Sequence, residues 1–352
     1  MAARARVAAL VATVCLALSA CTTTVADPPA GVTDIATGLD SPWSVLRLDS
    51  DVTLIGERDS GAIVSVAASG AVRTMATVPG VVHDGEGGLL GLAARDGWLY
   101  AYETTASDNR VIRMRLADDL SLGAPQVLLA GLHKAANHDG GRIAFGPDGM
   151  LYVTVGDAGD TANAQDRSSL NGKILRMTPA GGVPEGNPFP GSLVWSYGHR
   201  NPQGLAWDAA GQLWATEFGQ DTWDEFNRIE PGGDYGWPVV EGQAHDPRFV
   251  DPVLQWHTDQ ASPSGLAFVG GTFYLAALRG ERLWAVRVRP DGSASATDSF
   301  AGRFGRLRDV VAGPDDTLWV LTDNTDGRGD PRPGDDRLLR VPLTAVSTPR
   351  SG

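Results

Sequence analysis

The amino-acid sequence predicts an all-β protein, a six-bladed β-propeller of four-stranded antiparallel blades. A short pattern, in which a Gly- or Asp-rich turn leads into an alternating apolar strand, occurs six times along the chain. The six copies are 45, 52, 62, 60 and 45 residues apart, and such spacings are typical of propeller blades. No long segment combines the 3.6-residue apolar period of a helix with capping residues. The apolar residues that align the copies are Leu54, Leu99, Leu151, Leu213, Phe273 and Leu318.

Further short strands flank the repeated strands. A second strand follows each copy, as at Arg110–Met114 and Arg282–Val286, and another precedes it, as at Gly204–Trp207 and Gly265–Phe268. Short β-branched and aromatic runs bounded by Gly, Pro and Asp are typical of strands. Six units of about four strands each favour a closed propeller, because radial repetition protects the sheet edges. A large β-sandwich is the alternative, but a sandwich does not require six similar units.

Composition and charge are those of an ordinary globular protein. Of the 352 residues, 42% are hydrophobic and 20% are charged, which excludes a disordered chain. The length alone would suggest about two domains, but all-β folds often use a chain of this size as one unit. The net charge is −13 and basic residues do not cluster, so nucleic acid is not an expected partner.

The N-terminal segment has the pattern of a bacterial export signal. Arg4 and Arg6 supply basic charge, and Val7–Leu18 is an apolar run too short to span a bilayer comfortably. The run ends in Leu-Ser-Ala-Cys at residues 18–21, which is similar to a lipobox. We therefore expect residues 1–20 to be a lipoprotein signal peptide and Cys21 to carry lipid at the mature N-terminus. The alternative is an ordinary signal peptide that contains a cysteine.

This interpretation sets the expected domain organisation. Residues 21–32 are small, polar and Pro-containing and form a flexible tether, residues 33–345 form the propeller, and residues 346–352 form a C-terminal tail. Cys15, the only other cysteine, lies in the apolar run, so the exported domain has no disulfide. We expect a protein held at the outer face of the bacterial cytoplasmic membrane, touching the membrane through its lipid alone.

Charged residues occur at one phase of the repeat. In each copy one strand runs into a hairpin, and the repeated strand then returns beside it. Residues just before the first of these two strands and just after the second therefore lie on one face of the propeller. That face is the mouth of the central channel, where ligands usually bind. Different residue types occupy equivalent positions there, which favours a built site over a merely solvated rim. The positions before the first strand hold Glu86, His138, Arg200, Arg306 and Arg308, and those after the second hold Asp157, Gly219 and Arg279.

Several stretches at these positions carry a family resemblance. They are GEGGLLG (85–91), NHDGGRIAFGPDG (137–149), VGD (155–157), LNGKILR (170–176), YGHRNPQGLA (197–206), DYGWP (234–238) and GRLRDV (305–310). In this order they resemble the soluble aldose sugar and glucose/sorbosone dehydrogenases that depend on pyrroloquinoline quinone (PQQ). The run HRNPQGL (199–205) is the most specific, and the set spans nearly all of the chain after the export segment.

The resemblance implies an enzyme that oxidises an aldose at C1 to the lactone. Hydride passes to PQQ, and the electrons then pass to an external acceptor. His138 matches the general base that takes a proton from the anomeric hydroxyl, and Asp157 matches its hydrogen-bonding partner. Arg200 matches the residue that stabilises negative charge at the reactive carbonyl, and Asn201 matches a donor to the same quinone.

The resemblance also implies the residues that hold the cofactor. PQQ is a tricarboxylic acid, and Arg306 and Arg308 match a carboxylate-binding pair. Arg279 stands where many relatives carry Lys, and the two cations differ in geometry. Glu86 stands where a glutamine contacts PQQ in some relatives. A carboxylate there would repel the cofactor unless it faces an arginine or calcium-bound water, is protonated, or points away.

Calcium is implied in two places. One ion in the family bridges PQQ to two successive main-chain carbonyls, which match Gly219 and Gln220, although many relatives have Pro at the second position. Another ion is held by a glutamate side chain and a carbonyl ten residues later, which match Glu225 and Tyr235. Carboxylate and carbonyl oxygens are the hard ligands that calcium prefers.

Two other functions are compatible with a propeller. A calcium-dependent sugar lactonase would need a carboxylate-rich metal cluster at the mouth in place of several arginines. A non-enzymatic propeller that binds protein or glycan at the cell surface would leave His138 and the Arg306–Arg308 pair without a chemical role.

Overall fold

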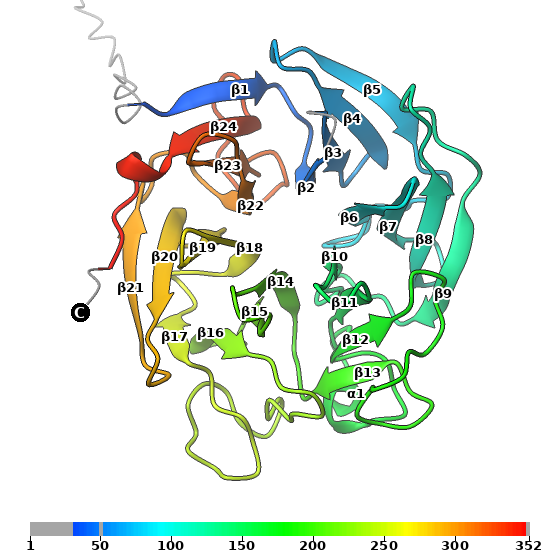
Figure 1. The fold of residues 1–352 in the computed structure, drawn as a ribbon, viewed down its shortest axis with the longest axis vertical. Coiled ribbons are helices and arrows are strands. Elements are labelled where there is room, and N and C mark those ends of the chain that lie inside the picture. Colours follow the sequence, from blue (N-terminus) through cyan, green and yellow to red (C-terminus); the bar gives the residue numbers. More distant parts are fainter. Residues whose placement is uncertain (1–30, 49–51, 350–352) are drawn as a thin grey trace, which may run out of the picture.

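The predicted six-bladed β-propeller is confirmed. A computed structural model describes residues 31–48 and 52–349, and in these ranges six four-stranded sheets form a ring (Figure 1). Sequential strands within each sheet pair antiparallel. The predicted signal peptide, Cys21 and most of the predicted tether lie outside the described residues.

The first three blades follow the chain from the inner to the outer strand. Blade one contains β2 (Pro42–Arg47), β3 (Thr53–Glu57), β4 (Ala62–Val66) and β5 (Val72–Thr77). Blade two contains β6 (Leu89–Arg95), β7 (Trp98–Thr104), β8 (Asn109–Arg115) and β9 (Gln126–Leu132). Blade three contains β10 (Ile143–Phe145), β11 (Leu151–Val155), β12 (Lys173–Met177) and β13 (Val194–Tyr197).

The last three blades repeat the arrangement. Blade four contains β14 (Pro202–Trp207), β15 (Leu213–Glu217), β16 (Trp223–Arg228) and β17 (Leu254–His257). Blade five contains β18 (Pro263–Val269), β19 (Thr272–Ala277), β20 (Arg282–Val288) and β21 (Ala294–Ser299). Blade six contains β22 (Leu307–Ala312), β23 (Thr317–Thr322), β24 (Arg337–Pro342) and β1 (Thr33–Thr37).

Strand β1 closes the ring. It is the outermost strand of blade six and pairs antiparallel with β24, with Thr33 opposite Arg340 and Thr37 opposite Arg337 (Figure 1). The start of the described chain is thereby joined to its end. This closure places one strand from the N-terminal side in the last blade, so no blade is left with three strands.

The apolar residues that align the repeats lie at equivalent places. Each belongs to the second strand of its blade, and none of Leu54, Leu99, Leu151, Leu213, Phe273 and Leu318 is more than 4% exposed. Within blade one, β4 is buried along its whole length, whereas the outer strand β5 is largely exposed. One core cluster, for example, joins Tyr102 of blade two to Val153 and Leu175 of blade three.

Helices are few among the described residues. The helix α1 (Ala162–Gln165) lies in the loop after β11, and a 3₁₀ turn (Leu343–Ala345) follows β24. No helix in the described part of the chain is long and apolar enough to cross a membrane.

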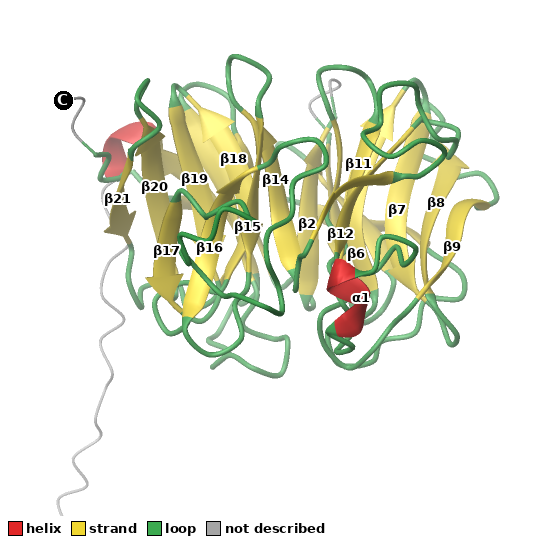
Figure 2. Cartoon of the chain, turned by 90° about the horizontal axis from the view of Figure 1, so that it is seen from below, coloured by secondary structure: helices red, strands yellow, loops and turns green. Residues whose placement is uncertain are grey.

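The strands run between two loop-covered faces of the ring, and α1 lies on one of them (Figure 2). Asp157 lies two residues after the end of β11 and precedes α1, so it belongs to the same face as α1. Glu86, Arg200 and Arg306 each come just before the first strand of a blade, and the antiparallel pairing brings these positions to that face as well.

Candidate active site

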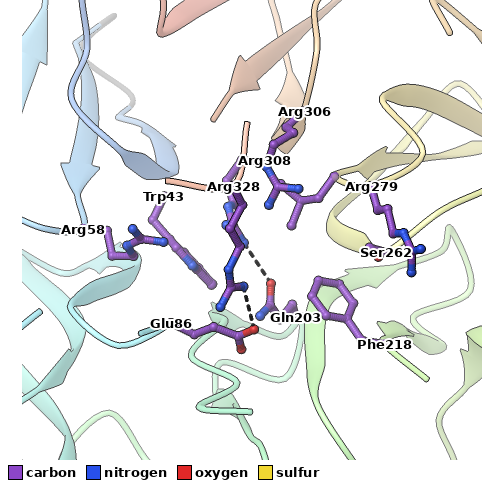
Figure 3. A pocket seen from close by; sticks show the side chains of 11 residues that line it. Trp43, Arg58, Glu86, Gln203, Phe218, Ser262, Arg279, Arg306, Arg308 and Arg328 are labelled. Carbon is purple, nitrogen blue, oxygen red and sulfur yellow. Dashed lines mark hydrogen bonds and ion pairs between the residues drawn. The ribbon is translucent and has the colours of Figure 1, made fainter. Parts of the chain in front are cut away.

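A polar cavity of about 390 Å³ opens among the blades. Five of its lining residues are arginines and one is a glutamate, and they come from blades one, two, five and six (Figure 3). An excess of cations in one concave site favours an anionic ligand. The lining residues are Trp43, Arg58, Glu86, Gln203, Phe218, Ser262, Leu278, Arg279, Arg306, Arg308 and Arg328.

The Arg306–Arg308 pair flanks Leu307 at the start of β22, and the alternation of side chains along a strand turns both arginines to one side. The Nη2 atom of Arg306 lies 2.8 Å from Asp326, and that of Arg308 lies 2.6 Å from Asp323. Arg308 also donates to Oε1 of Gln203 at 3.1 Å.

Arg306 retains an unused donor. Its Nε is buried and has no hydrogen-bond partner among residues 31–48 and 52–349. A buried N–H without a partner costs free energy, and a carboxylate oxygen of a bound ligand would satisfy it. The donor set therefore fits a polycarboxylate such as PQQ, which the resemblance implies. Arg279, in the short loop after β19, is exposed and lines the same cavity.

His138 and Asp157 form a buried pair beside the cavity. Nδ1 of His138 lies 2.7 Å from Oδ1 of Asp157, whose Oδ2 accepts a hydrogen bond from Nε1 of Trp237 at 2.8 Å. Burial alone would raise the pKa of Asp157, but the hydrogen bonds from His138, Trp237 and the Gly159 amide, with the charge of His138, lower it. Asp157 is thus held as a carboxylate, so Nδ1 of His138 donates to it, and in the neutral ring Nε2 is the acceptor.

Arg200 and Asn201 lie next to this pair. The guanidinium of Arg200 lies over the ring of Trp237, at 5.5 Å from the centroid, so one tryptophan contacts both Arg200 and Asp157. Arg200 also donates to Oε1 of Gln220 through Nε (3.0 Å) and Nη2 (2.6 Å). Burial lowers the pKa of Arg200, opposed by the charges of Asp157 and Glu217.

Asn201 links the blades. Its Oδ1 accepts from the amide of Gly140 at 3.0 Å and its Nδ2 donates to Glu86 at 3.3 Å. Its neighbour Arg200 accepts a hydrogen bond from the amide of Asp157 through its carbonyl at 2.8 Å. The structure therefore brings His138, Asp157, Arg200 and Asn201 together, although none of them belongs to the lining of the large cavity.

The loop after β15 carries Gly219 and Gln220, the first expected calcium position. Oε1 of Glu241 accepts four successive amides of this loop, from Gln220 at 2.7 Å to Trp223 at 3.1 Å. The amide of Gly219 is bound by Asp224 at 3.0 Å, and a Cβ at Gly219 would lie 1.9 Å from the carbonyl oxygen of Trp223. Only glycine fits there, and the loop conformation is tightly specified.

Glu225 and Tyr235, the second expected calcium position, line a small cavity of about 10 Å³ together with Glu217 and Glu241. Burial raises the pKa of Glu225 to about 8, and the charge of Glu217 adds to the effect. Such a carboxylate would gain from a nearby cation. Within the described ranges no group of three or more His, Cys, Asp or Glu side chains could hold a metal ion. A calcium ion here would therefore need main-chain oxygens, as the resemblance implies.

Several residues of this region were not predicted from the sequence, among them Asp323 and Asp326, which pair with the arginines. Trp237 belongs to the DYGWP stretch, which could have indicated it. Arg58, Arg328 and Glu241 belong to no stretch that the resemblance uses. Arg328 lies between β23 and β24, in a Gly-, Asp- and Pro-rich loop outside the phase of the repeat.

Comparisons with known proteins identify the family to which the chain belongs. The sequence profile of the Glucose / Sorbosone dehydrogenase family matches residues 39–340. The aldose sugar dehydrogenase YliI of Escherichia coli (strain K12) is 32% identical over 333 residues, which cover 82% of this chain and 89% of that protein. The quinoprotein glucose dehydrogenase B of Acinetobacter calcoaceticus is 34% identical over 253 residues, covering 60% of this chain and 53% of that protein.

Solved structures are similar over most of the chain. The PQQ-bound aldose sugar dehydrogenase of Streptomyces coelicolor is 50% identical with a TM-score of 0.85, covering 90% of this chain and 99% of that one. The apo-form of the soluble aldose sugar dehydrogenase of Escherichia coli is 29% identical with a TM-score of 0.78, covering 88% of this chain and 98% of that one. The resemblance predicted from the motifs is confirmed: the chain belongs to the glucose/sorbosone dehydrogenase family of oxidoreductases.

Proposed function

We propose that this protein is a PQQ- and calcium-dependent aldose dehydrogenase that oxidises its sugar at C1 to the lactone and passes the electrons to an external acceptor. The observation that carries this proposal is the buried His138–Asp157 pair beside an arginine-lined cavity. A base that is fixed by a carboxylate suits proton abstraction, and the arginines suit an anionic cofactor.

When bound, PQQ would supply the hydride acceptor. The Arg306–Arg308 pair and Arg279 would hold its carboxylates, because they line the cavity and Arg306 has an unused Nε donor. Arg200 and Asn201 would lie at the quinone side, where a cation and an amide donor stabilise developing negative charge.

His138 would take the proton of the anomeric hydroxyl on Nε2, since Nδ1 is engaged with Asp157. Asp157 would keep the ring in the productive tautomer and stabilise the imidazolium that forms. Trp237 supports both partners of the step, because it binds Asp157 and lies beneath Arg200.

Calcium would be bound by the carbonyls of Gly219 and Gln220 at the cofactor site, and by Glu225 with the carbonyl of Tyr235 at a second position. The tightly specified loop around Glu241 and the raised pKa of Glu225 support these assignments. Both sets are oxygen donors, as calcium requires.

We further propose the cellular arrangement that the N-terminal pattern indicates. Residues 1–20 would be removed on export, Cys21 would carry lipid, and residues 21–32 would tether a propeller of residues 33–345, with a tail of residues 346–352. The protein would then act at the outer face of the cytoplasmic membrane. A Cys21→Ala variant should move from the membrane fraction to the soluble exported fraction, and retention in the membrane fraction would contradict the lipid anchor.

The decisive test is reconstitution. The purified protein with PQQ and calcium should reduce an artificial dye when aldoses are added, and the same protein without PQQ should not. The absence of sugar-dependent reduction across a broad panel of aldoses would overturn the proposal. Hydrolysis of gluconolactone without quinone would support a lactonase, but a cavity lined by five arginines and one glutamate disfavours that function.

A further inference from the structure

Glu86 accepts hydrogen bonds from three other blades at once. Its Oε2 accepts from the main-chain amide of His138 at 2.9 Å and from Nδ2 of Asn201 at 3.3 Å. Its Oε1 accepts from Nη1 of Arg328 at 2.9 Å (Figure 3). Glu86 precedes blade two, His138 precedes blade three, Asn201 precedes blade four, and Arg328 belongs to a loop of blade six.

The contact with His138 is reinforced by the main chain. The amide of Glu86 donates to the carbonyl of Ala136 at 3.0 Å, so segments 85–86 and 136–138 exchange two hydrogen bonds. His138 adopts a positive φ of 63°, which is uncommon outside glycine and is retained where the surroundings enforce it. A Cβ at Gly85 would lie 2.0 Å from the carbonyl oxygen of Ala136, so this approach also requires glycine. Glu86 therefore helps to enforce the unusual backbone of His138.

Arg328 keeps the carboxylate charged. Its side chain is 47% exposed and that of Glu86 is 15% exposed, so the ion pair lies at the edge of the cavity. Burial alone would raise the pKa of Glu86, but the hydrogen bond and charge of Arg328, together with the amide and charge of His138, outweigh burial, and the pKa lies below its ordinary value. Three donors are then met by two carboxylate oxygens. A glutamine offers one acceptor oxygen and one donor nitrogen, so it could not accept from both His138 and Arg328.

We propose that Glu86 is a positioning residue that fixes His138 and Asn201, and that Arg328 is its counter-ion across the cavity. Glu86 then does not serve as a ligand of the cofactor, because both its oxygens are engaged and Arg328 offsets the repulsion toward a polycarboxylate. The inference rests on the proposed function for the role of His138, while the Glu86–Arg328 contact is a property of the protein alone.

Four variants test the kinetic side: Glu86→Gln, Arg328→Gln, Arg328→Lys and the matched surface control Arg289→Gln. We expect Glu86→Gln to lower kcat about tenfold while KM and the PQQ affinity stay within about twofold, since a misplaced base slows the chemical step. Arg328→Gln should have a smaller effect in the same direction, and Arg328→Lys should restore most of the rate because it keeps the charge. Arg289→Gln should leave all three quantities unchanged.

A second measurement requires no activity. In the cofactor-free protein, Glu86→Gln and Arg328→Gln should each move the NMR signals of the His138 ring, and the unfolding temperatures of the two single variants and the double variant should be non-additive. Additive unfolding temperatures, or unmoved His138 signals, would overturn the inference. A large loss of PQQ affinity in Glu86→Gln with kcat unchanged would also overturn it and make Glu86 a cofactor ligand. A wild-type protein without dehydrogenase activity would contradict the proposed function, and the NMR and unfolding data would still decide this inference.

Discussion

Nδ1 of His138 lies 2.7 Å from Oδ1 of Asp157, whose side chain is completely buried. Asp157 also binds Trp237 and the Gly159 amide, so its position does not depend on the histidine alone. This geometry leaves Nε2 of His138 as the only ring nitrogen available to a substrate. The acid–base chemistry of the proposed reaction therefore depends on a pair of residues rather than on one.

The first prediction concerns this pair. His138→Ala should lower kcat by about 10²–10⁴ because the general base is lost. Asp157→Asn should also cause a large loss, since an amide nitrogen facing Nδ1 would favour the tautomer whose Nε2 already carries a proton. Dye reduction at saturating sugar measures both effects. PQQ binding, followed by absorbance, should be retained, because neither residue lines the cavity. Turnover at the wild-type rate in His138→Ala would remove it as the base.

The second prediction concerns the unused donor of Arg306. Arg306→Gln should weaken PQQ binding by about 10- to 100-fold, the range expected for a lost charge-assisted hydrogen bond. The PQQ affinity of Arg306→Lys should lie between those of wild type and Arg306→Gln, because lysine keeps the charge but lacks the planar guanidinium group. Absorbance titration of the cofactor-free protein measures the affinity. Arg73→Gln removes an exposed arginine of β5 and should bind PQQ normally. Equal affinities in all four proteins would exclude a contact between Arg306 and the cofactor.

The repeat predicted the fold because its physical basis is local. Each aligned apolar residue, such as Leu99 or Leu318, fills the space between neighbouring blades, and the turn before it sets the hairpin. The same phase placed Glu86 and Arg306 at one cavity, since equivalent ends of antiparallel strands meet at one face. The closing strand β1 precedes the first repeat, and its pairing with β24 depends on a contact between distant parts of the chain.

Other parts of the site could not be predicted because they too depend on contacts between distant parts of the chain. Arg328 and Glu86 are 242 residues apart, and the loop that carries Arg328 does not follow the repeat. Glu241 accepts hydrogen bonds from the main-chain amides of the loop after β15, and main-chain donors leave no residue pattern. Charge alone suggested that Glu86 could face an arginine. Only the folded structure identifies that arginine as Arg328.

The third prediction concerns pH and Asp139. This carboxyl is 1% exposed, Oδ2 has no partner among the described residues, and Oδ1 accepts from Asn109 at 2.7 Å. Burial raises the pKa of Asp139 from 3.8 to about 7. The pKa of Asp139 is higher in the folded protein than in the unfolded chain. The contribution of Asp139 to stability is therefore complete below pH 4 and is lost as the pH rises through about 7.

Asp139→Asn should therefore remove part of the decline in stability between pH 4 and pH 7. The difference between the two proteins should grow across this window to an amount on the order of 4 kcal/mol at most, from a pKa rise of about three units. Urea unfolding of the cofactor-free proteins at several pH values measures it. Asp118→Asn changes an exposed aspartate and should leave the pH dependence unchanged. Parallel stability curves for wild type and Asp139→Asn would contradict a raised pKa.

The last prediction concerns Glu241 and calcium. Because one oxygen of Glu241 accepts four successive amides, it determines the conformation of the loop that carries the carbonyls of Gly219 and Gln220. Glu241→Gln keeps one acceptor but loses the charge, so the loop is held less firmly. Residues that orient ligands typically change metal affinity by about 10- to 100-fold, and we expect an effect in this range. Glu230→Gln changes an exposed glutamate after β16 and provides the control.

Thermal unfolding during a calcium titration of the chelator-treated protein gives the affinity without any need for turnover. Wild type and Glu230→Gln should gain stability at the same calcium concentration, and Glu241→Gln should require more. Because PQQ is absent from this titration, a weaker response would place the defect in the calcium loop and not in the arginines that would bind the cofactor. If Glu241→Gln instead bound calcium as wild type does, the loop would reach its binding conformation without the Glu241 charge, and the four amide contacts would serve folding alone.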